Sequence, residues 1–277
     1  MASFGIALGG GGVRGMAHIS ALEVIDDCGI QPTVVAGTSM GAIVGALYAS
    51  GIPGKVIRGE VDQFIIGKDD DLGDVLSKAP NLLKWLNVLR PEFRRGGMVK
   101  ADGLLKYVTE QIGAATFEDL EIPFYAITTD FWTGKQVVIH TGDLVPALKA
   151  SMAIPGVFAP IAIGDKILVD GGVVNNLPYD ILSKQCDHTI AIDVAPTRKP
   201  GDKRIPSMLD SVLGMFDILV EQVVSHKLEQ TPPTIYCRPE IIGVRTLDFD
   251  HIEDVYEMAK PAMESLRADL QKFIDTM

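Results

Sequence analysis

Cysteine is scarce in this chain of 277 residues, and the three cysteines lie far apart, at positions 28, 186 and 237. An odd number at such wide spacing argues against a disulfide framework and provides no paired-cysteine metal site. We therefore expect reduced, buried thiols in an intracellular protein.

Positive charge is also in deficit, because 25 lysine and arginine residues face 36 aspartate and glutamate residues. The formal net charge is -11 and the sequence pI is about 4.9. So acidic a chain repels nucleic-acid phosphates, and it repels anionic lipid unless a local basic patch intervenes. We expect no nucleic-acid partner.

Long apolar runs are missing too. No segment reaches the run of about 18 apolar residues that can span a bilayer. The first residues lack the basic region, apolar stretch and cleavage site of a secretory signal, so none is predicted. We expect a cytoplasmic protein, and any peripheral membrane contact is expected at the inner membrane face.

One stretch, residues 82–95, is locally basic and carries a tryptophan. Its apolar side is formed by Leu82, Trp85, Leu86 and Leu89, and Arg94 and Arg95 follow. One interpretation is a peripheral helix with solvated lysine and arginine side chains. The other is a flexible lid that makes transient contact with a membrane surface.

What the chain does contain is typical of a globular protein with a sizeable core, because 47% of its residues are hydrophobic and 22% are charged. Segments with strand patterns alternate with segments with helix patterns. This order predicts an α/β fold of three layers, with helices on both faces of a mostly parallel central sheet. No repeat or linker divides the chain, so we expect one domain over 1–277. Its motifs lie within 4–195, and C-terminal helices and a short strand lie within 196–277.

The apolar patterns also place the elements. Strands are expected at 4–8, 33–36, 123–130, 136–140, 166–172, 189–194 and 234–237, and helices at 16–28, 42–49, 101–112, 144–152, 208–228 and 255–277. The short link between 123–130 and 136–140 predicts that these two strands pair antiparallel. Pro261 predicts a kink or a break in the last helix.

The most informative motif is Gly-Thr-Ser-Met-Gly at 37–41, which reads G-x-S-x-G between a buried strand and a helix. In that context the motif is typical of a nucleophilic serine on a sharp turn, with Ser39 exposed above the sheet. Gly37 and Gly41 let the strained turn form without a Cβ clash. The alternative is an ordinary strand–helix connection that contains a serine.

A second motif, Gly-Gly-Gly-Val-Arg-Gly at 10–15, also follows a strand and precedes a helix. Its spacing matches the dinucleotide fingerprint G-x-G-x-x-G, but that site needs an acidic residue near the end of the second strand. Here the second strand ends in Gly37-Thr38-Ser39, which contains no acidic residue, so a dinucleotide site is disfavoured. The other use of such a loop is to present backbone N–H groups to an oxyanion.

An activated serine needs a base. His18, in the first turn of the helix after the glycine loop, is one candidate, although it could simply pack there. Asp170 is another, because it ends a strand and is followed by Gly171 and Gly172. An aspartate can take the serine proton directly when the two oxygens are within hydrogen-bonding reach. The alternative for Asp170 is a polar cap at a strand end.

Together, the motifs at 10–15, 37–41 and 170–172 resemble the patatin-like phospholipase family, in particular its compact bacterial members. The stretches 151–160 and 175–178 are similar to that family as well. The resemblance covers residues 4–195, and 196–277 carries no matching motif.

The resemblance implies a Ser–Asp dyad that cleaves lipid acyl esters and needs neither a metal nor another cofactor. Carried over by position, Ser39 is the nucleophile, Asp170 is the base, and Gly10, Gly11 and Gly12 supply the oxyanion hole. Supporting roles fall to Arg14, Gly15, Gly37, Gly41 and Gly171, with Arg14 stabilising either the loop or the developing charge.

Three rival hypotheses remain open at this point. One is a triad hydrolase in which a histidine is the base. The second is an acyltransferase that uses the same acyl-enzyme chemistry. The third is a non-catalytic regulator that binds a lipid or a protein partner. The partner expected for the enzyme is a lipid or acyl-ester substrate, and neither its head group nor the oligomeric state follows from the sequence.

Overall fold

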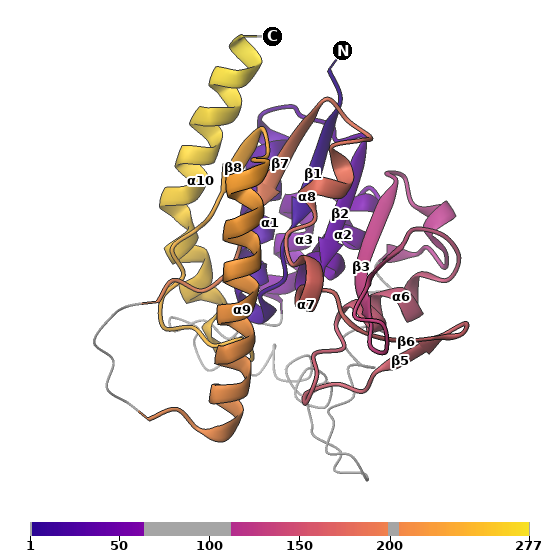
Figure 1. Ribbon diagram of the computed structural model, residues 1–277. Helices are drawn as coiled ribbons and strands as arrows, with labels where there is room; N and C mark the ends of the chain where they lie inside the picture. Colours follow the sequence, from indigo (N-terminus) through magenta and orange to yellow (C-terminus); the bar gives the residue numbers. More distant parts are fainter. Residues whose placement is uncertain (1, 64–111, 199–204, 277) are drawn as a thin grey trace.

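Short runs rich in valine, isoleucine and alanine form the strands of one mixed sheet (Figure 1). The computed structural model describes residues 2–63, 112–198 and 205–276. In this part of the chain the strands are β1 (Phe4–Leu8), β2 (Val34–Thr38), β3 (Phe124–Asp130), β4 (Gln136–Ile139), β5 (Ile161–Ile163), β6 (Lys166–Asp170), β7 (His188–Ile192) and β8 (Ile235–Cys237).

The strand order is β5-β6-β3-β2-β1-β7-β8, with β4 paired to β3. Strands β1, β2, β3, β7 and β8 run parallel, whereas β4 and β6 run antiparallel to β3 and β5 runs antiparallel to β6. The sheet is therefore mostly parallel, and the antiparallel pairing predicted for 123–130 with 136–140 is confirmed.

Helices cover both faces of this sheet, which confirms the three-layer α/β/α prediction (Figure 1). One layer contains α1 (Ala17–Asp27), α2 (Met40–Ala49), α3 (Gly54–Asp62), α6 (Leu144–Ser151) and α10 (Ile252–Asp275). The other contains α7 (Gly172–Asn175), α8 (Tyr179–Leu182) and α9 (Met208–Gln230). Three short 3-10 turns join them: η1 (Gly12–Met16), η2 (Phe117–Asp119) and η3 (Phe249–His251).

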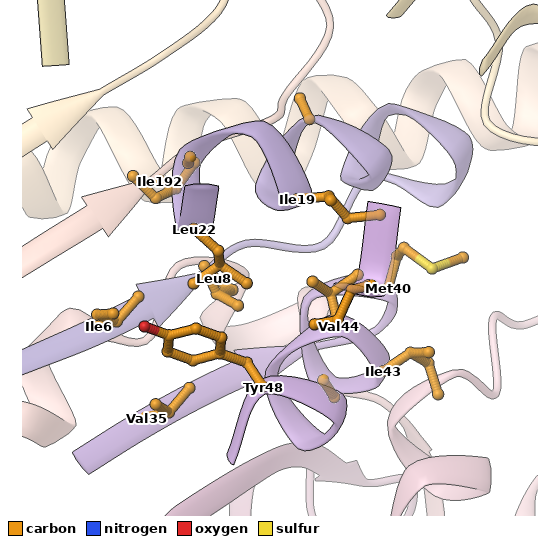
Figure 2. Close-up of a cluster of buried hydrophobic side chains, with 14 of the residues drawn as sticks. Ile6, Leu8, Ile19, Leu22, Val35, Met40, Ile43, Val44, Tyr48 and Ile192 are labelled. Carbon is orange, nitrogen blue, oxygen red and sulfur yellow. The ribbon is translucent and has the colours of Figure 1, made fainter. Parts of the chain in front are cut away.

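The side chains of β1 alternate between the two layers, as the period of a strand requires. Ile6 and Leu8 belong to the larger cluster with α1 and α2, where Figure 2 shows them beside Leu22 and Tyr48. Ala7 points to the smaller cluster with α8 and α9. The larger side chains thus lie under α1 and α2, and α8 approaches the sheet over smaller ones.

The register of β3 positions the site. The residue of β3 that pairs with Thr38, the last residue of β2, is Ile127. The next residue, Thr128, pairs with Asp170, the last residue of β6. Strands β2 and β6 run in opposite directions along β3, so their carboxyl ends meet there. This meeting places Ser39, directly after β2, beside Asp170.

The structure also corrects two expectations. Helix α10 continues through Pro261, so of the predicted kink or break the break does not form. Cys28 and Cys186 are half-buried rather than buried, while Cys237 is buried, and all three thiols are free. The stretch 82–95 and the helix expected at 101–112, apart from its last residue, lie outside the described residues. Within the described ranges, no helix combines the length and apolarity needed to cross a membrane.

Candidate active site

Ser39 lies on a sharp turn between β2 and α2, as the G-x-S-x-G motif predicts, but it is buried rather than exposed above the sheet, because the glycine loop and α9 cover the turn. Its φ angle is 54° and its ψ angle is -122°, and among the described residues it is the only non-glycine residue with a positive φ angle. Such a conformation costs on the order of 1–3 kcal/mol and persists only where the surrounding structure enforces it. The strain therefore marks Ser39 as a residue held in place by its neighbours.

The two glycines of the motif are required by close backbone contacts rather than by their own φ angles. A Cβ atom on Gly37 would lie 2.3 Å from the carbonyl oxygen of Gly41. A Cβ atom on Gly41 would lie 2.2 Å from the carbonyl oxygen of Leu8. The turn and the first residues of α2 thus pack directly on β1.

The backbone of Ser39 is fixed by a buried serine from the end of α6. The Ser39 N–H donates to Oγ of Ser151 at 2.9 Å, and the Ser151 hydroxyl donates to the carbonyl oxygen of Ile127 at 2.7 Å. Two residues later, the carbonyl oxygen of Ala153 accepts the N–H of Asp170 at 3.0 Å. The segment after α6 therefore holds both Ser39 and Asp170 by their backbones.

Replacing Ser151 by alanine should leave the Ser39 N–H without a partner in a buried site, at a cost of about 1–3 kcal/mol in stability. Because the turn is strained, its loosening should lower kcat for an ester substrate by about 10-fold with little change in KM. Ser20→Ala, a matched truncation of another buried serine, which accepts from Arg58, should keep the wild-type kcat. A wild-type kcat in Ser151→Ala would contradict the positioning role.

Asp170 is 1% exposed and ends β6. Burial raises the pKa of its carboxyl group to about 6, while hydrogen bonds from the Gly172 N–H and the Ser39 hydroxyl lower the pKa. The Gly172 N–H donates to Oδ1 at 2.7 Å. The carboxyl group is thus influenced by the Ser39 hydroxyl, and its pKa is better matched to accepting a proton than that of an exposed aspartate.

The glycine loop after β1 lies over the same site, but its three glycines differ. The Gly10 N–H donates to the Asn176 carbonyl oxygen at 3.2 Å, and Nδ2 of Asn176 donates back to the Gly10 carbonyl oxygen at 3.0 Å. The N–H groups of Gly11 and Gly12, at the start of η1, find no acceptor among the described residues. Gly11 and Gly12 are therefore the better-placed oxyanion donors.

Side chains are excluded from this loop and from the segment beside Asp170. Gly12 has a φ angle of 58°, and a Cβ atom on it would lie 2.1 Å from the carbonyl oxygen of Thr246. On Gly15 a Cβ atom would approach Met40 Cγ to 2.5 Å, and on Gly171 it would approach the Ile127 carbonyl oxygen to 2.3 Å. These glycines allow the loop, the serine turn and the end of β6 to pack closely.

Arg14 supports the loop from behind. Its side chain is buried and donates to the carbonyl oxygens of Val194 and Val244 at 3.3 and 3.2 Å. Its Nη2 also forms an ion pair with Asp217 at 2.9 Å. Burial lowers the pKa of the guanidinium, and Asp217 opposes that shift. Of the two roles left open by the sequence, these contacts favour stabilisation of the loop.

All five histidines fall within the described ranges, and none of them lines the cavity at Ser39. His18, the candidate base, is fully buried, and its Nε2 lies 2.7 Å from the carbonyl oxygen of Gly9. A carbonyl oxygen only accepts, so Nε2 carries the proton and donates it there. Burial lowers the pKa of His18 to about 4. His18 is thus a neutral residue that fixes the end of β1.

A small cavity joins the predicted site residues. It is lined by Gly10, Gly11, Gly12, Ser39, Asp170 and Asn176, and by residues from the C-terminal part of the chain. Sequence reasoning missed the latter group, Leu213, Phe216, Asp217, Val220 and Thr246, because no motif marks them. Its volume of about 20 Å³ holds roughly one water molecule.

Residues 6–183, well over half of the chain, match the family model of the patatin-like phospholipases. The chain belongs to the patatin-like phospholipase family. The resemblance inferred from the three motifs is thereby confirmed.

Two relatives show how much sequence this patatin-like chain shares with longer proteins. An uncharacterized NTE family protein of Mycobacterium tuberculosis (strain ATCC 25618 / H37Rv) is 34% identical over 190 residues, which make up 68% of this chain and 48% of the relative. The lysophospholipase NTE1 of Saccharomyces cerevisiae is 28% identical over 300 residues, covering 99% of this chain and 17% of the relative. The patatin-like chain thus spans about half the length of the first relative and less of the second.

Among solved structures, VipD from Legionella pneumophila is similar to this patatin-like chain with a TM-score of 0.52 and 12% sequence identity. The match covers 95% of this chain and 67% of VipD. At so low an identity the likeness concerns the fold alone.

Proposed function

We propose that this patatin-like chain is a serine hydrolase that cleaves acyl esters of lipids through Ser39 and Asp170. The observation that carries the proposal is that Ser39 and the buried Asp170 carboxylate line one cavity together with the glycine loop. Family membership supports a lipid ester as the substrate class. The name of the yeast relative makes lysophospholipids the first substrates to test.

In the acylation step, Asp170 takes the hydroxyl proton of Ser39 as Oγ attacks the ester carbonyl carbon. The carbonyl oxygen becomes an oxyanion, which the N–H groups of Gly11 and Gly12 stabilise. Each such donor contributes about 100- to 1000-fold in turnover. When the tetrahedral intermediate collapses, the bond to the leaving alcohol breaks, and that alcohol takes the proton from Asp170.

In the deacylation step, water attacks the acyl group on Ser39 while Asp170 accepts a proton from that water. The second tetrahedral intermediate uses the same N–H donors at Gly11 and Gly12. Its collapse releases the fatty acid and returns the proton to Oγ of Ser39. The resting serine and the ionised aspartate are thereby restored.

The pKa of Asp170 predicts the pH dependence. Because Asp170 has to be ionised to accept a proton, kcat/KM should be flat above pH 7 and fall about 10-fold per unit well below the pKa of about 6. The measurement uses a soluble ester without titratable groups, and the variant His18→Gln should give the same inflection. A flat profile between pH 5 and 8 contradicts Asp170 as the base.

The proposal is tested by fatty-acid release from three substrates: a lysophospholipid, a diacyl phospholipid and a short soluble ester. Release from at least one of them is the expected result. Adding an alcohol acceptor separates hydrolysis from acyl transfer, because an acyltransferase yields a new ester in place of free fatty acid. Lipid binding without any turnover would instead favour a non-catalytic regulator.

A further inference from the structure

Exposed apolar side chains gather on one helix. Of the twelve large apolar side chains that are exposed among the described residues, seven lie between residues 205 and 223. These seven, named here the outer face of α9, are Ile205, which precedes the helix, and Met208, Val212, Met215, Ile218, Leu219 and Val223 on it. Their spacing of mostly three and four residues forms a continuous stripe along the helix. Such a patch marks an interaction surface.

The outer face of α9 carries no charge, although the chain is strongly acidic. Between Met208 and His226 the only charged residues of α9 are Asp210, Asp217 and Glu221, and all three are half-buried. Each forms an ion pair with an arginine elsewhere in the chain: Asp210 with Arg245 at 3.4 Å, Asp217 with Arg14 at 2.9 Å and Glu221 with Arg238 at 2.7 Å. The outward positions are left to apolar residues together with Ser211, Gln222 and His226.

The opposite side of the same helix covers the candidate active site. Leu213, Phe216, Asp217 and Val220 line the cavity at Ser39. With these side chains in place the cavity is about 20 Å³, far too small for a fatty acyl chain. A long-chain acyl ester therefore reaches Ser39 only after the lining side chains in the first half of α9, Leu213 and Phe216, have moved aside.

The first half of α9 is held by more exposed contacts than the second half: Asp210 pairs at 3.4 Å with Arg245, whose side chain is 68% exposed, and Arg198 donates to the Gly214 carbonyl oxygen at 2.7 Å. Leu213 packs in a small cluster with Ile154 and Val157, separate from the two larger cores. Gly214 lies within the helix, and a Cβ atom added there would meet no atom within 4 Å. Packing therefore does not require a glycine at position 214, and this glycine weakens the helix there. From Asp217 onward, the ion pairs with Arg14 and Arg238 fix the second half.

We infer that the outer face of α9 docks on a lipid surface with uncharged or zwitterionic head groups, and that docking opens the cavity at Ser39. The face offers no charges to a polar partner, and the net charge of -11 disfavours an anionic surface. An apolar helix face can bury its side chains in the interface of a bilayer, and this binding does not require ion pairs with the lipid head groups. The link to turnover rests on the proposed function, because the docked surface then also supplies the substrate.

The arrangement of the molecule agrees with such docking. Figure 1 shows the first half of α9 extending past the sheet at the edge where the turn between β3 and β4 lies. That turn exposes Phe131 and Trp132, of which Trp132 is 77% exposed. Aromatic side chains of this kind favour the membrane–water interface.

The test compares wild type with the double variant Ile218→Glu/Leu219→Glu in flotation with phosphatidylcholine vesicles. Wild type should float, and the double variant should bind at least 10-fold more weakly. Hydrolysis of vesicle lipid should fall at least 10-fold, while hydrolysis of a short soluble ester stays within about two-fold. The matched control is Val56→Glu, an equally exposed apolar residue of α3 in the opposite layer, which should bind and hydrolyse like wild type. Circular dichroism verifies that each variant is folded.

The outcomes separate this inference from the proposed function. If wild type and the double variant float equally, or if neither floats, docking through α9 is overturned even when soluble esters are hydrolysed. A wild-type dimer that the double variant dissociates assigns the face to a second copy of the chain and also overturns the inference. If wild type floats and the double variant does not, but neither releases fatty acid from any ester, docking stands and the proposed function fails.

Discussion

Ser39→Ala should abolish ester hydrolysis, with a loss of at least ~10⁴-fold in kcat, because the proposed acyl-enzyme forms on the Ser39 hydroxyl. Alanine removes only Oγ, and the backbone N–H at position 39 can still donate to Ser151. The fold is therefore expected to survive, and a thermal melt checks this. The positive φ angle at position 39 is as unfavourable for alanine as for serine, so the turn between β2 and α2 stays strained.

Intact mass after treatment with a fluorophosphonate probe gives the independent measurement. Wild type should gain one adduct, peptide mapping should place it on Ser39, and Ser39→Ala should gain none. Ser183→Ala, which truncates a serine of the loop after α8 with a hydroxyl bonded only to the Asp180 carbonyl, is the matched control and should label like wild type. An adduct that persists in Ser39→Ala would move the nucleophile elsewhere.

Asp170→Asn should remove activity by about 10³- to 10⁴-fold and at the same time stabilise the protein. The amide oxygen can still accept the Gly172 N–H, which now donates to Oδ1 at 2.7 Å, but the amide cannot accept the serine proton. The variant thus keeps the shape of the site and loses its base. A histidine base predicts instead a variant that retains most of its activity.

The stabilising effect follows from the pKa of Asp170. Burial raises it from 3.8 to about 6, so the folded state binds the proton more tightly than the unfolded state. Asp170 therefore favours folding below pH 4, and this contribution is lost as the pH rises through about 6. Two pKa units correspond to about 3 kcal/mol. The asparagine side chain has no charge to bury, so the variant should be more stable than wild type by up to about this amount at pH 7.5 and about equally stable at pH 4.

Urea unfolding of both proteins between pH 4 and 8 isolates this term, because every other carboxylate is common to the two. Asp193→Asn is the matched control, since Asp193 is also fully buried beyond a strand end but does not line the cavity. Its carboxylate accepts from the Ala195 N–H and the Tyr236 hydroxyl, so it should lose stability and keep its activity per folded molecule. A wild-type stability profile for Asp170→Asn would contradict the raised pKa.

The sequence was sufficient where the determinants are local. The turn at Ser39 depends on two glycines within five residues and on the strand and helix that flank it, and all of these can be read from consecutive positions. The alternation of strands with helices predicted the layers for the same reason. The structure places Ser39 on the turn that the motif predicts.

Long-range pairing was not accessible in this way. From its own neighbours Asp170 could equally have been a strand cap, and only the family resemblance assigned it to Ser39. Its position depends on β6 running antiparallel to β3, and the sequence argument gave no pairing partner or direction for the strand at 166–172. The contacts of Arg14 with Val244 and Asp217 join segments more than 200 residues apart, and neither neighbour carries a motif.

The sequence analysis did not predict that α9 covers the cavity at Ser39, and this was its largest omission. Residues 208–228 were correctly predicted as a helix, but a helix pattern does not tell which surface the helix covers. The membrane hypothesis was placed on 82–95, which lies outside the described residues, and the described structure offers α9 as another candidate. Apolar residues of α9 lie both on its exposed side and on the side that faces the cavity. The apolar pattern in the sequence therefore could not tell which side is buried.

The meeting of β2 and β6 on β3 makes the proposed catalysis all-or-none with respect to strand pairing. Ser39 and Asp170 are adjacent only because Ile127 and Thr128 follow one another in β3. A slip of β6 by one residue would bring Val169 opposite Thr128 and turn every side chain of the strand to the other face. Molecules in which β6 pairs in a slipped register are therefore expected to be inactive. Recovered turnover after refolding therefore counts the molecules in which β6 has found its native partner.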